Sequence, residues 1–171
     1  MRRVAVIGSA SGNGKTTFGR ALARRLGVPF VEMDALHHGP NWTEATAEEL
    51  RAKVEPIVAT DAWVIDGAYM GKLGHLVVGS ADTVVWLDQP VWIWLPRLLR
   101  RTVVRAARRE ELWNGNRESF RMSFLSRDSV IYFALKNNWR RRREYVTRLA
   151  PYNVVRLQTQ QEVDRFLEHA S

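Results

Sequence analysis

The sequence contains no cysteine and no long apolar run. The lack of cysteine excludes disulfide bonds and thiolate metal sites, and it is typical of proteins in a reducing cytosol. Apolar runs after the N-terminus, such as Val91–Leu95, are much too short to cross a bilayer. The opening "MRRVAVIG" begins like a signal peptide, but its apolar stretch is also too short for one. We therefore expect a cytoplasmic protein with no membrane segment.

The sequence also lacks internal repeats and low-complexity linkers. Its 171 residues suit one domain, and a hydrophobic content of 46% with seven tryptophans can supply a packed core. We predict a single domain over residues 1–171.

Acidic side chains are scarce in the segment from Arg97 to Arg148. Fifteen Lys or Arg residues accompany five Asp or Glu there, so the segment carries +10 while the whole chain carries +8. This concentration predicts an anionic partner, either the phosphates of a small ligand or a nucleic-acid backbone. A solvated helix face explains only part of it, the run "RRRRE" at residues 140–144.

Short β-branched strands alternate with amphipathic helical segments along the chain. We predict strands at residues 4–7, 29–34, 62–67, 82–88 and 153–157. We predict helices at residues 14–26, 46–59, 90–108 and 128–149, and a final one from residue 159. Continuous apolar strands between helices indicate a parallel sheet covered on both faces. The fold class is therefore three-layer α/β, with an arginine-rich helical excursion between the fourth and fifth strands.

A phosphate-binding loop is indicated by "GSASGNGKTT" between the first strand and the first helix. The usual pattern is a glycine, four residues, then Gly-Lys-Ser/Thr. Gly14, Lys15 and Thr16 fit it, but the first-glycine position holds Ser9, and Gly8 lies one residue too early. Either Ser9 takes the glycine position or the loop is one residue longer. A glycine turn used only for tight packing is disfavoured, because Gly-Lys-Thr-Thr directly opens an amphipathic helix.

The chemistry of such a loop assigns roles to its residues. Backbone N–H groups cradle phosphates, the lysine reaches the β- and γ-phosphates, and the first threonine offers its hydroxyl to Mg²⁺. The candidate ATP-binding residues of the loop are Ser11, Gly12, Asn13, Gly14, Lys15, Thr16 and Thr17. We expect Ser9 or Ala10 to shape the entrance of the loop.

An aspartate lies at the carboxyl end of each of three predicted strands: Asp34, Asp66 and Asp88. Ligands of open α/β sheets lie beyond the carboxyl ends of the strands, where a carboxylate can hold a metal-bound water or take an acceptor proton. We assign Asp34 and Asp66 to catalysis and predict Thr16 with Asp66 as the magnesium site. Asp88 precedes Gln-Pro, and we interpret it as a turn residue. Gly67 would let a substrate approach the backbone closely.

Two histidines, His37 and His38, follow Asp34 closely. On an extended segment adjacent side chains point in opposite directions, which disfavours a shared metal ion. We expect one of the two, His37, to contact the substrate.

Two arginines, Arg97 and Arg101, lie four residues apart on one predicted helix face, where they can grip a phosphate chain. We assign both to ATP binding and Arg101 also to catalysis. Further arginines surround a segment that could close over the site: Arg105, Arg108, Arg109, Arg117, Arg121 and Arg127.

Stretches from the whole chain are similar to those of one family. They are "SGNGKTT", "VEMDALH", "VIDG", "VVWLD", "RLLRR" and "QEVDRFL". Together they resemble adenylate-kinase-like P-loop kinases. In addition, "DALHHGPNW" and "ELWNGNRES" resemble segments of the bacterial adenylate-kinase-related or topology-modulation proteins. The resemblance implies a five-stranded parallel sheet in the order 2-3-1-4-5, binding of ATP and Mg²⁺, and a lid at about residues 105–128.

The resemblance also implies roles for single residues. Asp66 and Gly67 match the "DG" after the third strand of adenylate kinases, and Arg127 falls in the lid and is assigned to catalysis. Asp34 and His37 resemble the acceptor segment of gluconate-type sugar kinases, which implies an acceptor region at about residues 34–60. The "DG" is followed by "AYM" instead of "FPR", so an AMP-binding arginine is missing there.

We therefore predict ATP- and Mg²⁺-dependent phosphoryl transfer to a small acceptor, either a nucleoside monophosphate or another hydroxyl compound. Two alternatives stay open: a nucleic-acid-associated ATPase or polynucleotide kinase, and a nucleotide-binding regulator with weak catalysis. The first is motivated by the basic segment with its Trp113 and Trp139. The oligomeric state is open too, because Trp92 and Trp94 suit a core or a dimer face equally.

Overall fold

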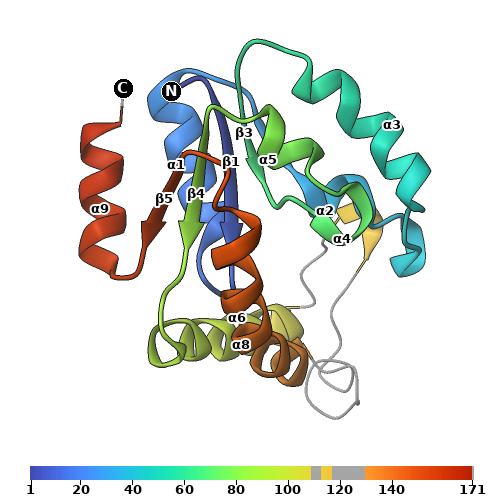
Figure 1. Cartoon of the computed structure of the whole chain (residues 1–171). Coiled ribbons are helices and arrows are strands. Elements are labelled where there is room, and N and C mark those ends of the chain that lie inside the picture. The colour runs from blue at the N-terminus through green and yellow to red at the C-terminus, as the bar shows by residue number, and fades with distance from the viewer. Residues whose placement is uncertain (109–112, 117–129, 171) are drawn as a thin grey trace.

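A parallel sheet of five strands runs through the middle of the molecule (Figure 1). The computed structural model describes residues 1–108, 113–116 and 130–170. The strands are β1 (Arg3–Gly8), β2 (Phe30–Glu32), β3 (Trp63–Asp66), β4 (Thr83–Leu87) and β5 (Val154–Leu157). Their order in the sheet is β2-β3-β1-β4-β5, and all four pairings are parallel. The predicted fold class and strand order are confirmed.

Helices cover both faces of this sheet (Figure 1). The longer ones are α1 (Lys15–Leu26), α3 (Ala47–Val58), α6 (Val91–Arg108), α8 (Val130–Arg148) and α9 (Gln160–His169). The short ones are α2 (Met33–His37), α4 (Met70–Leu73), α5 (Leu76–Ser80), η1 (Pro40–Trp42) and η2 (Trp113–Gly115). Helices α1 and α9 pack on one face, and α3, α5 and the end of α8 pack on the other.

The two faces follow directly from the alternation of residues along each strand. In β1, Val4 and Val6 belong to the core under α1 and α9, whereas Ala5 and Ile7 belong to the core under α3 and α5. This is the period of two expected for a strand buried on both sides. The continuous apolar strands of the sequence are explained by burial between two helical layers.

Two helices begin at the capping boxes predicted from the sequence. The Thr46 hydroxyl accepts from the Glu49 backbone N–H, and the Glu49 carboxylate accepts from the Thr46 N–H. Thr159 and Glu162 form the same reciprocal pair at the start of α9. Each box satisfies two N–H groups that a helix cannot bond internally.

The segment after the second strand differs from the prediction. The strand ends at Glu32, and Met33–His37 forms the short helix α2. Met33 and His37 are both buried. Residues four apart share a helix face, so burying both favours a helical turn over continued strand. Asp34 therefore lies on a helix, and a strand does not lead directly into it.

Between β4 and β5 the chain forms the arginine-rich excursion, of which α6 and α8 are described. Trp94 is fully buried against Ala10 and Leu98, whereas Trp92 is 74% exposed. Trp94 is thus a core residue. Most of the lid expected at about residues 105–128, Arg127 included, lies outside the described residues. A search of the described helices finds none long and apolar enough to cross a membrane.

Candidate active site

The phosphate loop joins β1 to α1 at the carboxyl edge of the sheet. Six residues, Ser9 to Gly14, separate the last residue of β1 from the first residue of α1, Lys15. The usual pattern also has six residues from its first glycine to the glycine before the lysine. Ser9 therefore takes the first-glycine position, and the loop is not longer than usual.

The entry of the loop is buried. Ser9 and Ala10 are both buried, and the expectation that they shape the entrance of the loop stays a prediction. Ala10 packs against Trp94 of α6. The Ser9 hydroxyl donates to Asp88 Oδ1 at 2.8 Å and accepts from Trp86 Nε1 at 2.9 Å. Ser9 and Ala10 thus hold the loop against the core, and the close contacts explain why both positions carry small side chains.

The middle of the loop is pressed against α6. Gly12 has φ of 86°, and a Cβ added to it would lie 2.9 Å from Leu98 Cβ and 2.9 Å from the Trp94 carbonyl oxygen. Gly14 also has a left-handed φ of 78°, but a Cβ there would meet nothing within 4 Å. The buried Asn13 side-chain amide donates to the Leu87 carbonyl oxygen at 2.8 Å. The loop conformation is thus set by contacts with β4 and α6.

The remaining predicted loop residues lie at the start of α1. The aliphatic part of Lys15 passes over Gly8, where an added Cβ would lie 3.0 Å from Lys15 Cδ. Ser11, Lys15 and Thr16 are half-buried, and Thr17 is exposed. Gly8, although outside the formal pattern, leaves room for the lysine side chain.

Thr16 and Asp66, the predicted magnesium residues, contact each other. The Thr16 hydroxyl donates to Asp66 Oδ2 at 2.5 Å. Asp66 is 6% exposed, and its Oδ1 has no hydrogen-bond partner in the part of the chain that the structure describes. Burial raises the pKa of Asp66, while Lys15 and the Thr16 hydrogen bond act in the opposite direction. A buried, unsatisfied carboxylate oxygen beside a hydroxyl suits the hard oxygen coordination of Mg²⁺.

Asp34, the predicted acceptor residue, lies in the same region as this pair. The Tyr69 hydroxyl donates to Asp34 Oδ1 at 2.6 Å. Burial, followed by the charge of Asp34, strongly raises the pKa of Tyr69, so the phenol keeps its proton. Tyr69 has a left-handed φ of 44°, which is rare for a bulky residue and often found where function demands it. The charge of Asp34 also contributes to the raised pKa of Asp66, so the two carboxylates share one region.

Tyr69 is the site residue that the sequence did not reveal. The "AYM" after the "DG" was visible only as a departure from adenylate kinases. Gly67 itself has φ of 98°, and an added Cβ would lie 3.2 Å from Met33 Cβ. The turn after β3 thus packs closely on α2 and brings the tyrosine to Asp34.

His37 is buried beside Tyr69, with 4.7 Å between their ring centroids. Its Nε2 lies 3.4 Å from a Glu44 carboxylate oxygen, and its Nδ1 has no hydrogen-bond partner among the described residues. Burial lowers the pKa of His37, and Lys72 and His38 lower it further. The expectation that His37 and His38 point in opposite directions is wrong, because the rings contact edge to face at 4.7 Å.

Two asparagines within the expected lid region, Asn114 and Asn116, bind the predicted acceptor segment. The buried Asn116 side chain accepts from the Trp42 backbone N–H and donates to the Gly39 carbonyl oxygen, both at 2.8 Å. The Asn114 side chain donates to the His38 carbonyl oxygen. The described part of "ELWNGNRES" therefore docks on "DALHHGPNW", although the two stretches are far apart in sequence.

The arginines of α6 lie together as expected. Arg97 and Arg101 line one surface depression with Arg100. Arg97 donates to Gln89 Oε1 at 3.0 Å and to Gln160 Oε1 at 2.9 Å, which connects α6 to the start of α9. The described structure thus confirms the shared face, while their role in ATP binding stays a prediction.

Asp88 is not a simple turn residue. It is fully buried and forms ion pairs with Arg142 of α8 and Arg156 of β5. The interpretation of Asp88 as a residue that merely begins a turn is therefore wrong. The Gln-Pro that follows ends β4, but the carboxylate faces the core and not the solvent.

Comparison with known proteins points to kinases. The shikimate kinase family matches residues 11–56, which is less than half of the chain. This stretch runs from the phosphate loop through most of α3. No curated protein sequence matches the chain.

Several solved kinase structures have the same fold. A shikimate kinase from Bacteroides thetaiotaomicron is 15% identical, with a TM-score of 0.57 over 98% of this chain and 94% of that chain. A gluconokinase from Sinorhizobium meliloti 1021 is 20% identical, with a TM-score of 0.55 over 99% and 89%. A deoxyadenosine kinase from M. mycoides with bound dCTP is 8% identical, with a TM-score of 0.54 over 96% of both chains.

At these identities the likeness shows the fold. Together with the family match, it supports a small-molecule P-loop kinase whose acceptor is unspecified. The comparisons support this class in general, not the adenylate-kinase-like or topology-modulation group in particular, and they do not support a nucleic-acid partner.

Proposed function

We propose that the protein transfers the γ-phosphoryl group of ATP to a hydroxyl group of a small molecule. One observation carries the proposal: the Thr16–Asp66 pair at the phosphate loop and the Tyr69–Asp34 pair on the acceptor side lie in one region. The first pair suits a phosphate-bound cation, and the second suits a hydroxyl that must lose its proton.

In this proposal Lys15 binds the β- and γ-phosphates, and Arg97 and Arg101 offset their charge. Thr16 and Asp66 are the residues that would hold Mg²⁺, which when bound neutralises charge on the phosphate oxygens. Arg127, assigned to catalysis from the sequence, stays a prediction. Charge neutralisation is the main requirement of phosphoryl transfer, because the transferring group spreads its charge over its oxygens.

Asp34 is proposed to orient and deprotonate the acceptor. Its Oδ1 accepts the Tyr69 hydrogen bond, which leaves Oδ2 for the acceptor hydroxyl. As the acceptor oxygen bonds to the γ-phosphorus, the bond from that phosphorus to ADP breaks and the hydroxyl proton passes to Asp34. The buried, neutral His37 lies beside this pair and is proposed to contact the acceptor.

The acceptor region favours an uncharged hydroxyl compound over a nucleoside monophosphate. Residues 34–60 contain two basic side chains, Arg51 and Lys53. Arg51 is bonded to Glu55 and to the Leu73 carbonyl oxygen, and Lys53 is bonded to the Leu36 carbonyl oxygen. The "DG" is also followed by "AYM" and not by an arginine. Arg51 and Lys53, already bonded within the protein, therefore give little support for binding the phosphate of a nucleoside monophosphate.

We also propose kinship with the adenylate-kinase-related, topology-modulation group. The two stretches that carry this resemblance, "DALHHGPNW" and "ELWNGNRES", contact each other through Asn116. Sequence stretches that meet in space are more informative together than two separate similarities. Alignment of further relatives that keep Gly39, Trp42 and Asn116 together would support the kinship, and their independent variation would count against it.

The test is an ADP-release assay with Mg²⁺-ATP and a panel of nucleosides, sugars, polyols and nucleoside monophosphates. We expect at least one acceptor to accelerate ADP release well above the rate with water. Lys15→Ala should abolish this turnover, and Asp34→Asn should lower kcat by roughly 10²- to 10⁴-fold, as for loss of a general base.

Asp61→Asn is the matched control, because exposed Asp61 precedes β3 at the opposite, amino end of the sheet. It should behave like the wild type. If no acceptor exceeds water, or if Lys15→Ala leaves turnover unchanged, the proposed function is refuted.

A further inference from the structure

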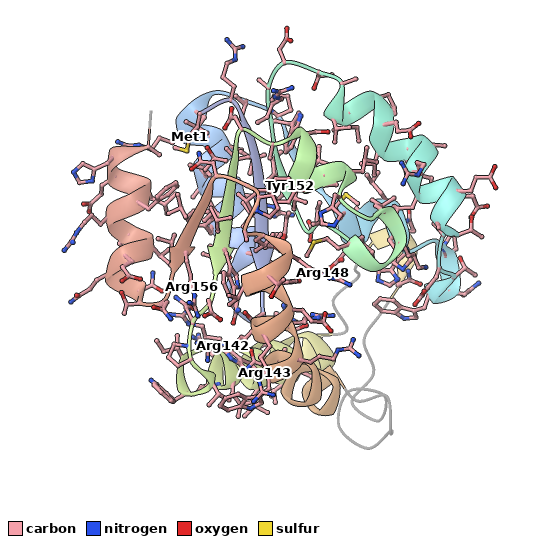
Figure 2. The ribbon with its side chains drawn as sticks, viewed as in Figure 1. Met1, Arg142, Arg143, Arg148, Tyr152 and Arg156 are labelled. Carbon is pink, nitrogen blue, oxygen red and sulfur yellow. The ribbon has the colours of Figure 1, made fainter. Side chains whose placement is uncertain are left out.

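An ionic cluster around a buried carboxylate lies at the carboxyl end of β4. Asp88 is 0% exposed and receives both Arg142 and Arg156. Arg142 Nε lies 2.8 Å from Asp88 Oδ1 and its terminal nitrogen lies 3.0 Å from Oδ2, a two-pronged contact. Arg156 Nε donates to Oδ2 at 2.9 Å. Figure 2 shows the two arginines reaching this place from α8 and β5.

The cluster includes the first residue of the phosphate loop. Ser9 is buried, and its hydroxyl donates to Asp88 Oδ1 while accepting from Trp86 Nε1. The Arg156 guanidinium lies 4.4 Å from the centroid of the Trp86 ring. The Ser9 hydroxyl therefore makes both of its hydrogen bonds within this cluster.

The sheet register explains why these residues meet. Ile7 of β1 pairs with Trp86 of β4, and Trp86 pairs with Arg156 of β5. Ser9 and Asp88 come two residues after Ile7 and Trp86, so alternation returns them to the same face. That face is the one covered by the end of α8, which supplies Arg142.

Such a cluster fixes the relative positions of its residues more than it stabilises the fold. A buried ion pair contributes little net stability, because desolvation offsets its attraction. A two-pronged arginine–carboxylate contact, in contrast, fixes distance and orientation. Here it fixes α8, the returning arm of the excursion after β4, relative to residue 9 of the loop. A glycine at position 9, as the usual pattern has, would lack the hydroxyl that makes this connection.

We propose that Ser9, Asp88 and Arg142 are positioning residues that tie the phosphate loop to α8, so that the placement of α8 sets nucleotide affinity. The proposal rests on the proposed function in one respect, that the loop binds nucleotide phosphates. None of the three residues needs to touch the nucleotide. They affect nucleotide affinity by setting the conformation of the loop from Ser9 to Lys15.

The test measures the Kd of a fluorescent ATP analogue with Mg²⁺ for Ser9→Ala, Arg142→Gln and the double variant. Each single change should raise Kd by roughly fivefold, within the range found for directly coupled neighbours. The double variant should resemble either single one, because both changes break the same connection. Thermal unfolding of the same samples shows that Kd is measured on folded protein.

Arg140→Gln is the matched control for charge. Arg140 is on the same helix, but its side chain is 70% exposed and pairs with Glu144. We expect its Kd to stay within about twofold of the wild type, because an exposed pair constrains little. Arg142→Lys keeps the charge but loses the two-pronged geometry, so it should raise Kd as Arg142→Gln does. It also carries the test if Arg142→Gln does not fold.

Three results would overturn the proposal. They are an unchanged Kd in folded Ser9→Ala and Arg142→Lys, additive effects in the double variant, and equal effects of Arg140→Gln and Arg142→Gln. Lys15→Ala separates this failure from that of the proposed function. If Lys15→Ala abolishes binding while the positioning variants do nothing, only the positioning role is wrong. If Lys15→Ala leaves binding intact, the nucleotide site itself is wrong.

Discussion

Replacing Gly12 with alanine should separate α6 from the phosphate loop. Gly12 has φ of 86°, and its added Cβ would lie 2.9 Å from both Leu98 Cβ and the Trp94 carbonyl oxygen. Real Cβ contacts essentially never fall below 3.0 Å. Because the Trp94 oxygen belongs to the backbone, a side-chain rotation cannot relieve the overlap, and α6 must shift.

The expected cost has two parts. A left-handed conformation costs an alanine about 1–2 kcal/mol relative to glycine. Overpacking of a tight contact adds about 1–3 kcal/mol. Gly12→Ala should therefore lower the free energy of unfolding by about 2–5 kcal/mol. Gly14→Ala carries only the first part, about 1–2 kcal/mol, because its Cβ would meet nothing within 4 Å.

Urea denaturation of the nucleotide-free protein measures both losses. Replacing glycine with alanine also reduces the conformational entropy of the unfolded chain, by the same amount in the two variants. The difference between their free energies of unfolding therefore reports the overlap with α6. For a chain of this size each kcal/mol also lowers Tm by roughly 2–4 °C. Since α6 carries Arg97 and Arg101, we further expect Gly12→Ala to raise the KM for ATP.

Equal losses for Gly12→Ala and Gly14→Ala would refute this reasoning. They would mean that α6 does not press on the loop as the Leu98 and Trp94 distances indicate. A Gly12→Ala variant as stable as the wild type would refute the left-handed conformation as well.

Three further changes test the acceptor side. Tyr69→Phe removes the donor to Asp34, so kcat should fall while the free energy of unfolding drops by only about 0.5–1.5 kcal/mol; an unchanged kcat in steady-state assays contradicts this. Burial lowers the pKa of His37 below its ordinary 6.5, so the unfolded chain protonates first and stability is lost as pH falls through and below 6.5. His37→Gln should reduce the difference in the free energy of unfolding between pH 7.5 and 5.5, measured by urea titration. An unchanged difference argues against a buried neutral histidine. Asn116→Ala should cost about 1–3 kcal/mol by removing two hydrogen bonds to half-buried Gly39 and Trp42, and should raise the acceptor KM more than the ATP KM; equal changes in both contradict the docking.

Much of the fold could be predicted from local patterns. The alternation of Val4, Ala5, Val6 and Ile7 between two cores follows from strand geometry alone. Capping boxes at Thr46 and Thr159 state where their helices begin, because the bonds involved span three residues. The strand order came from resemblance, since parallel pairing joins residues far apart in the chain.

The candidate site was predictable only where its chemistry is local. Lys15 and Thr16 were found from the loop pattern, and Asp66 from its position after β3. Thr16 and Asp66 contact each other because the carboxyl ends of the adjacent strands β1 and β3 meet at one edge, while their role in holding Mg²⁺ stays a prediction. Tyr69 could not be predicted, because its role depends on a left-handed backbone turn and a partner 35 residues away.

The sequence by itself determined the alternation of strands and helices, the phosphate loop and the excess of basic residues. Only the tertiary structure decided that Ser9 faces the core, that Asp88 is an ionic partner and not a turn residue, and that Trp94 is buried while Trp92 is exposed. The physical reason is the range of the interactions. Periodicity and capping act within a turn or a strand, whereas Ser9 meets Asp88 across 79 residues. Such a contact exists only once the sheet brings the ends of β1, β4 and β5 together.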